Sequence, residues 1–150
     1  MTLPDPAILA IPYLMEFPSM VRCTREDQHG REIKDWKKAN ALLSGLNVKG
    51  RSFIIFEKEY GDYVQCAGSK KAMTIEARSY NKDGTFRHVV FGFRELDGDE
   101  VEIPGNERNH HTDASQVLTL KNARSILQPW LAGYAFPTRF VQTDITSHFL

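Results

Sequence analysis

The stretch SFIIFEKEYGDYVQCAGS, residues 52–69, predicts a β-hairpin. Residues 52–57 are mostly apolar and aromatic, residues 60–62 form a Tyr-Gly-Asp turn signal, and residues 63–67 resume a strand pattern. Charged and aromatic side chains accompany this apolar run, namely Glu57, Lys58, Glu59, Tyr60 and Tyr63. From the residues alone, this hairpin is the wall of an active site, the edge of a binding surface, or the rim of a core.

Two further strand patterns follow the hairpin, at residues 73–80 and 86–93. The connection between them contains Asp83-Gly84, a pair that is typical of tight hairpin turns. Short connections force neighbouring strands to be antiparallel, so we expect a meander. Residues 73–80 alternate between apolar and polar side chains, which indicates one covered face and one hydrated face. A second Asp-Gly turn at residues 96–100 precedes a short apolar-centred strand.

Helical spacing appears on either side of the meander. Apolar residues recur three and four positions apart over residues 32–46, which predicts an amphipathic helix. A second pattern follows Thr119, which we expect to cap a helix. Pro129 lies inside this second pattern and should kink the helix or end it early, and Gly133 is a stop signal.

The remaining segments have weaker signals. We expect short strands at residues 13–17, 19–24 and 116–120, a loop at residues 25–32, and a polar loop at residues 104–115. Together the patterns predict an α+β fold in one domain over residues 1–150, with residues 1–31 as an extended, proline-rich segment. The core of the fold is an antiparallel sheet of four to six strands packed against two main helices.

The composition of the chain argues against several classes of function. The chain has 150 residues and carries 19 basic and 19 acidic residues, a net charge of zero, which argues against direct nucleic-acid binding. No apolar stretch approaches the length of a membrane span, and the N-terminus lacks a basic signal-peptide region. We therefore expect a cytoplasmic protein without a membrane partner. The two cysteines form no CxxC pair and indicate no zinc site.

Two groups of residues could carry chemistry. Glu107, His110 and His111 are metal-ligand types, but they lie in a predicted loop, and adjacent histidines in an extended chain point to opposite sides. Cys66 and His88 could meet across a sheet as nucleophile and base, but nothing beside Cys66 favours an activated thiolate. We expect no catalytic residue, no metal and no cofactor.

Acidic residues are concentrated in one part of the chain. Between residues 95 and 102 there is no basic residue, and the carboxylates there are Glu95, Asp97, Asp99, Glu100 and Glu102, with Glu107 following. Such a segment is either a solvated turn or a patch that steers a cationic partner. Tyr60 and Asp62, at the hairpin turn, are further candidates for a contact edge.

The order of these elements and several short strings resemble the immunity proteins of bacterial polymorphic-toxin and contact-dependent-inhibition systems. The resemblance covers residues 32–150: a helix ending in ALLSGLN, the strands SFIIFEKEYGDYVQCAG, MTIEARSY and RHVVFGF, a late helix LTLKNARSILQPWLAG, and the tail VQTDITSHF. It implies a cytoplasmic, non-enzymatic protein that binds one cognate toxin domain, such as a nuclease, and blocks its active site or substrate entry.

Two alternatives remain from the residues. One is a small-ligand-binding or enzymatic α+β domain with a site near Glu107, His110 and His111. The other is a structural subunit that associates with itself.

Overall fold

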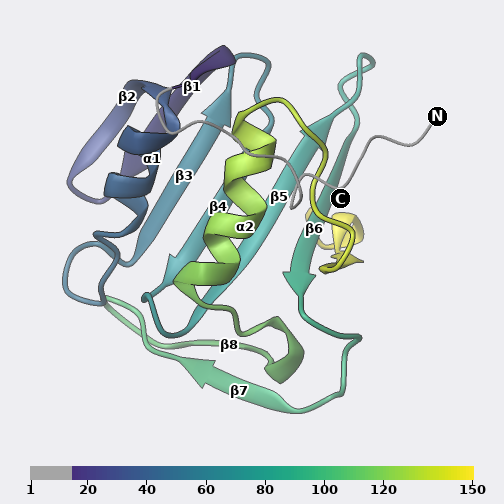
Figure 1. Ribbon diagram of the computed structural model, residues 1–150. Helices are drawn as coiled ribbons and strands as arrows, with labels where there is room; N and C mark the ends of the chain where they lie inside the picture. Colours follow the sequence, from purple (N-terminus) through teal and green to yellow (C-terminus); the bar gives the residue numbers. More distant parts are fainter. Residues whose placement is uncertain (1–14) are drawn as a thin grey trace.

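The computed structural model describes residues 15–150, and its largest element is a seven-stranded antiparallel sheet. The strand order is β2-β1-β3-β4-β5-β6-β9 (Figure 1). The strands are β1 (Glu16–Arg25), β2 (Gln28–Asp35), β3 (Phe53–Lys58), β4 (Tyr63–Gly68), β5 (Met73–Tyr80), β6 (Phe86–Gly92) and β9 (Val141–Asp144). A separate ribbon pairs β7 (Glu100–Ile103) with β8 (His110–Asp113).

This architecture confirms the predicted α+β class. The four strands of the predicted meander, β3 to β6, pair with their sequence neighbours in register. The β1–β2 hairpin extends the sheet beyond β3, and β9 extends it beyond β6, so the sheet is wider than the expected four to six strands. The interpretation of residues 1–14 lies outside the described residues.

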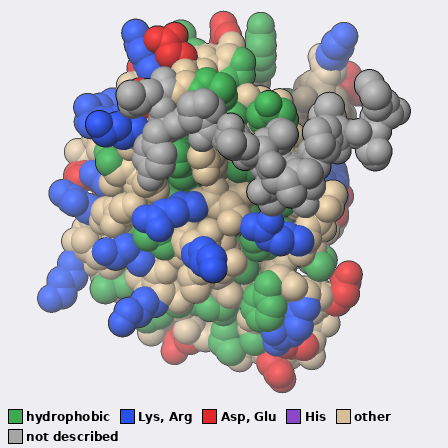
Figure 2. Space-filling model, viewed as in Figure 1, with side chains coloured by type: hydrophobic (Ala, Val, Ile, Leu, Met, Phe, Trp, Pro, Cys, Tyr) green, Lys and Arg blue, Asp and Glu red, His purple; other side chains and the backbone are tan. Residues whose placement is uncertain are grey.

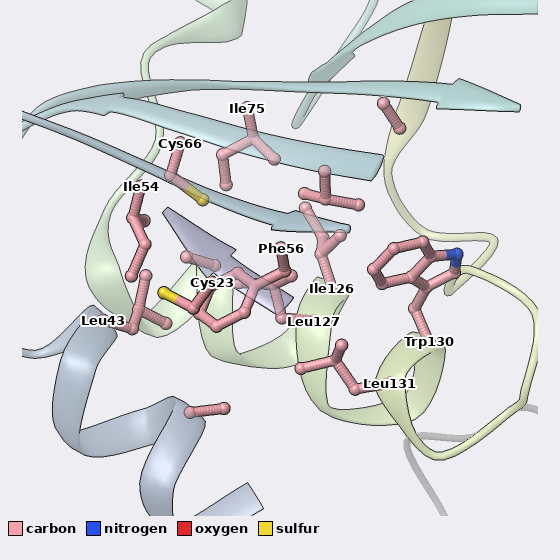
Figure 3. Close-up of a cluster of buried hydrophobic side chains, with 14 of the residues drawn as sticks. Cys23, Leu43, Ile54, Phe56, Cys66, Ile75, Ile126, Leu127, Trp130 and Leu131 are labelled. Atoms are coloured by element: carbon pink, nitrogen blue, oxygen red, sulfur yellow. The ribbon is translucent and has the colours of Figure 1, made fainter. Parts of the chain in front are cut away.

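Both helices, α1 (Trp36–Leu43) and α2 (Leu120–Leu131), cover the same face of the sheet (Figure 1). Alternate residues of β3 and β4 point toward them: Ile54 lies opposite Cys66, and Phe56 lies opposite Val64. All four side chains are fully buried. Figure 3 shows side chains from the strands meeting those of the two helices in one continuous cluster.

The first helix is shorter than predicted, because the residues expected to form its first turn belong to strand β2. Residues 32–35 belong to β2, where Ile33 pairs with Val21 of β1 and is buried. Asp35 then caps α1, its Oδ1 accepting a hydrogen bond from the Lys38 backbone N–H at 3.0 Å. The expected loop at residues 25–32 is also wrong, because β1 ends at Arg25 and β2 begins at Gln28.

Two other expectations are corrected near the C-terminus. The polar loop at residues 104–115 contains strand β8, and residues 116–120 do not form a strand. There, a 3-10 helix η2 (Ala114–Gln116) is followed by a single bridge between Leu118 and Met73. Helix α2 continues two residues past Pro129, while the predicted cap is confirmed: Asn122 Oδ1 accepts from the Thr119 backbone N–H at 3.0 Å. The chain ends in a 3-10 helix, η3 (Thr146–Phe149).

Two adjacent residues of β3 test the assignment of the two faces. Phe56→Ala should lower the free energy of unfolding by about 3–5 kcal/mol, because it leaves a cavity between the sheet and the helices. Ile55→Ala should cost roughly 1 kcal/mol, because Ile55 faces outward and is only partly buried. Urea denaturation of both variants measures the difference, and equal losses would contradict the assignment.

Candidate functional site: the open face of the sheet

The face of the sheet opposite α1 and α2 carries no α-helix among residues 15–150. The outward residues of β3 and β4 on this face are Phe53, Ile55, Glu57, Tyr63, Gln65 and Ala67. All are at least partly accessible, in contrast to the buried residues between them. The face therefore combines aromatic, aliphatic and polar side chains on a rigid sheet.

A first hollow on this face has a volume of about 410 Å³ and lies beside the β3–β4 turn. Its residues come from the two strands, the turn and the end of β5, and they are Ile55, Glu57, Tyr60, Gly61, Tyr63, Gln65 and Tyr80. Gly61 has φ +98°, and the Tyr80 ring lies 3.5 Å from where a Cβ would stand. The turn therefore packs closely against the ring that closes one side of the hollow.

A second hollow, of about 570 Å³, lies at the other end of the same strands. It is enclosed by the loop between β7 and β8, and its residues are Glu26, Ser52, Phe53, Gln65, Ala67, Gly105, Asn106, Glu107, Arg108 and His110. Gln65 lines both hollows, and Glu57 is shared between the first hollow and a third one beside Met20 and Arg22. The depressions thus adjoin one another across the open face.

The wall of the second hollow is held in place by hydrogen bonds to distant parts of the chain. Glu26 Oε2 accepts from Asn106 Nδ2 at 3.0 Å, and Asn106 Oδ1 accepts from the Gly50 backbone N–H at 3.0 Å. Glu26 Oε1 also accepts from the Ser52 hydroxyl at 2.8 Å and from the Ser52 backbone N–H. One carboxylate therefore joins the β1–β2 turn, the start of β3 and the β7–β8 loop.

A polar cluster lies next to the first hollow, under the C-terminal 3-10 helix. Arg78 Nε donates to His88 Nδ1 at 3.0 Å, so the proton of this imidazole lies on Nε2, which is 2.8 Å from Glu76 Oε1. The Arg78 guanidinium also rests on the rings of Phe86, at 4.0 Å, and Phe149, at 4.6 Å. The cluster is satisfied internally, and it fixes η3 against the sheet.

Burial also changes the pKa of Tyr63, which lies between the first hollow and this cluster. The pKa of the Tyr63 hydroxyl is raised, mainly because the group is partly buried, although the nearby Arg78 cation opposes the shift. Tyr63 is therefore a neutral hydrogen-bonding side chain over the physiological range of pH.

The structure distributes the residues predicted for the site over separate regions. Tyr60 and Asp62 lie at the β3–β4 turn, beside the first hollow, and Tyr60 is 86% exposed. The Asp62 side chain has a structural role: its Oδ1 accepts a hydrogen bond from the Tyr80 backbone N–H at 2.9 Å. Glu107 lines the second hollow, at the opposite end of β3 and β4. These residues therefore border one face but do not form one cluster.

The predicted acidic segment lies apart from the hollows, on the loop after β6 and on the ribbon. Asp97 pairs with Arg94, and its Oδ1 accepts from the Asp99 backbone N–H at 3.0 Å. Glu95 and Asp99 form no ion pair within the described residues. Asp97 thus serves the local fold, which favours the solvated-turn interpretation for this residue.

The outer side of the ribbon retains two exposed carboxylates around a histidine. His111 Nδ1 lies 3.5 Å from Glu100 Oε1, and His111 Nε2 lies 3.7 Å from Glu102 Oε1. Ile103 and His110 occupy the opposite side of the ribbon, as expected for alternation along extended strands. Glu107 and His110 therefore share the second hollow, while His111 does not reach it.

The other chemical groupings considered in the sequence do not assemble in residues 15–150. No group of three or more potential ligands is placed to hold a metal ion there. Cys66 is fully buried on the helix side of β4, and its thiol pKa is raised to about 12 by burial. His88 pairs with Arg78 on the open face, so the sheet separates it from Cys66.

Sequence reasoning missed the residues that make the face a site. Ile55 and Gln65 were not singled out, nor were Glu76 and Arg78. The available signal was the alternation itself: outward positions of the two central strands are as apolar or aromatic as many inward positions. Apolar and aromatic residues at the outward positions Phe53, Ile55 and Tyr63 indicate a surface that another molecule covers.

Comparisons with protein-family models, curated proteins and solved structures find no match for this chain. Within the described residues, none of the helices is long and apolar enough to cross a membrane.

One acid at the base of the ribbon gives a testable pH dependence. The Asp113 carboxylate accepts from the Ser115 hydroxyl at 2.6 Å and from the backbone N–H groups of Ser115 and Gly98, both at 2.9 Å. These hydrogen bonds hold the pKa of Asp113 well below its usual range.

A carboxyl whose pKa is lowered by folding stabilises the protein above its unfolded pKa, roughly 3.9, and this contribution is lost as the pH falls. Asp113→Asn should therefore reduce stability at pH 7 and make stability less dependent on pH between about 5 and 2. Urea midpoints across this range measure the effect. Glu95→Gln, at an exposed acid of the neighbouring loop, should leave the pH dependence close to that of the unmodified protein.

Proposed function

We propose that this protein binds a cognate bacterial toxin domain in the cytoplasm and neutralises it, as an immunity protein, by covering its active site or substrate entry. The open face of the sheet is the docking surface. The observation that carries the proposal is the uneven distribution of exposed apolar side chains over the molecule.

Among the described residues, the large exposed hydrophobic side chains are Met20, Tyr60, Tyr80, Phe93, Leu96, Phe149 and Leu150. Tyr60 and Tyr80 line the first hollow, and Met20 lines the third. Phe149 packs beside His88 on the same face, while Phe93 and Leu96 belong to the acidic loop after β6. None comes from α1 or α2. Four of these seven side chains, Met20, Tyr60, Tyr80 and Phe149, thus lie on the open side of the sheet, and exposed apolar side chains grouped in this way are typical of a protein interface.

The charges favour the same side for a cationic partner. The exposed charged side chains of α1 are Lys37 and Lys38, and those of α2 are Lys121 and Arg124, with no acid in either helix. Figure 2 shows Lys and Arg side chains spread over this helix-bearing face. Acidic residues lie on the ribbon and line the hollows, where Arg22, Lys58 and Arg108 accompany them. A positively charged partner would therefore meet acids on the sheet side and only bases on the two helices.

This distribution of charge fits a toxin that acts on nucleic acid. A protein that grips a phosphate backbone presents Lys and Arg side chains at its substrate site. Carboxylates of this protein, including Glu57 and Glu107 on the open face and Glu100 and Glu102 on the ribbon, would occupy the positions of those phosphates. Neutralisation then requires only tight coverage, without chemistry on either protein.

The second hollow supports one alternative function, the binding of a small ligand. His110 Nε2 is buried and has no hydrogen-bond partner within the described residues, and Glu107 and Arg108 border the same hollow. A ligand with a hydrogen-bonding group would satisfy this nitrogen. Loss of a measured ligand affinity or activity in His110→Ala, for a protein that does not neutralise the toxin, would favour this alternative over the immunity function.

Co-expression tests the proposed function directly. The toxin domain encoded beside this gene should arrest growth when it is expressed alone, and co-expression of this protein should restore growth. Ile55→Asp should abolish the rescue, because it places a charge in the centre of the apolar surface, whereas Lys37→Glu on the helix face should retain it. Rescue by Ile55→Asp, with loss in Lys37→Glu, would place the docking surface on the helices instead.

Charge reversal on the ribbon tests steering separately from docking. Glu100→Lys combined with Glu102→Lys should slow association with the toxin about tenfold at low salt and weaken its salt dependence. Dissociation should change less, because both side chains are exposed at the edge of the proposed interface. Stopped-flow mixing measures both rates, and Lys37→Glu combined with Lys38→Glu is the matched control. Association rates that remain unchanged in the ribbon variant would remove the acidic segment from the proposal.

A further inference from the structure

The first hollow contains polar groups without partners. The Glu57 carboxylate, the Tyr60 and Tyr63 hydroxyls and the Gln65 amide all line it, and none forms a side-chain hydrogen bond or ion pair within the described residues. Glu57 and Tyr60 are exposed, and Tyr63 and Gln65 are half-buried. All four groups are therefore available to a partner that covers the hollow.

Aromatic rings surround these groups. Tyr60, Tyr63 and Tyr80 contribute three rings, and Ile55 provides an aliphatic wall between the two strands. The Tyr63 and Glu57 positions face each other directly across the β3–β4 ladder. A carboxylate beside several aromatic faces is the chemistry that recognises an organic cation.

The protein's own nearby cations leave Glu57 unpaired. Arg78 bonds His88 and rests on the rings of Phe86 and Phe149, and it also lies 5.7 Å from the centre of the Tyr63 ring. Lys58 lies 4.1 Å over the Trp130 ring and is partly buried. Arg22 lies opposite Glu57 in the β1–β3 register but forms no ion pair with it. The negative charge of Glu57 is therefore not paired within residues 15–150.

We propose that the first hollow accepts an arginine side chain of the partner protein, with its guanidinium against the Glu57 carboxylate and its plane against the tyrosine rings. This inference deepens the proposed function, on which it rests for the identity of the partner as a protein. The volume of about 410 Å³ lies toward the small end of ligand pockets and suits one side chain rather than a whole ligand.

Arginine fits the site better than other side chains do. Its guanidinium donates in a planar fork that matches a carboxylate, and it stacks on aromatic rings, whereas the lysine ammonium is a strongly hydrated point charge. An anionic group would meet Glu57, and an apolar side chain would cover Glu57 and Gln65 without satisfying them. The neighbouring Arg78, held between Phe86 and Phe149, shows the same kind of contact within the chain.

The site can be tested without the toxin. The probe is N-acetyl-arginine-N-methylamide, titrated into ¹⁵N-labelled full-length protein while backbone amide shifts are recorded. Saturable shifts should appear at Gly61, Gln65 and Tyr80, with a dissociation constant on the order of millimolar, because a lone exposed cation site is weak. The citrulline analogue has nearly the same shape and no charge, and it should bind at least about fivefold more weakly.

Matched variants separate the carboxylate from its surroundings. Glu57→Gln should weaken arginine binding about fivefold, and Tyr60→Ala should weaken it to a similar extent. Glu59→Gln changes an exposed acid outside this hollow, and Phe93→Ala removes an exposed ring of the β6–β7 loop, so both should bind as the unmodified protein does. Tyr60 is 86% exposed, so its removal should not affect folding.

The outcomes distinguish this inference from the function on which it rests. Absence of saturable shifts, equal binding of the citrulline analogue, or unchanged binding in Glu57→Gln would each overturn the arginine site. Neutralisation of the toxin by a protein that fails these tests would overturn the site alone. Arginine binding with the expected variant pattern, in a protein that does not rescue growth, would support the site and contradict the immunity function.

Discussion

The register between β3 and β4 is the constraint on which the core and the candidate site both depend. It places Phe56 opposite Val64 on the helix side and Ile55 opposite Gln65 on the open side. A slip of one residue would move each buried side chain to the open face and each site residue into the core. The hydrophobic burial that stabilises the helix layer therefore also fixes the positions of Glu57, Tyr63 and Gln65 relative to one another. The site needs no separate stabilising device, because the core supplies its rigidity.

Polar contacts also hold the β1–β2 hairpin, at one edge of the sheet, in addition to its core residues Val21, Cys23 and Ile33. Arg25 is only 7% exposed, and its guanidinium donates to both Asp27 oxygens and to the Leu42 carbonyl at 2.9 Å. One side chain therefore joins the β1–β2 turn to the last turn of α1, where backbone carbonyls lack helical partners. Glu26, the next residue, bonds the β7–β8 loop through Asn106. Two consecutive residues thus connect the edge hairpin to α1 on one side and to the wall of the second hollow on the other.

The parts of the fold that were predictable are those set by local pattern. The meander followed from alternation and short turns, and the cap at Thr119 followed from residue type. The errors arose where distant residues decide the outcome. Gly30 reads as a turn signal, yet it has φ +59° within β2, where the β1–β2 register shifts between Cys23 and Arg25. The polar residues of β8 form a strand because β7 pairs with them. The acidic segment was visible as composition, but the hollows were not, since each joins side chains from separate strands, and the second also includes a loop some forty residues further along the chain.

The unpaired groups of the open face also bear on how one partner would be selected. When the face is free, water satisfies the Glu57 carboxylate, the Gln65 amide and the tyrosine hydroxyls at little cost. When a partner covers the face, each group that finds no complementary donor or acceptor costs about 1–3 kcal/mol, and more if it is charged. Burial of Ile55 and Phe53 favours binding of any partner that covers them. The unpaired polar groups instead weaken the binding of every partner that does not supply matching donors and acceptors. An apolar face alone would bind many proteins, so it is the unpaired polar groups among the rings that would restrict binding to a cognate surface.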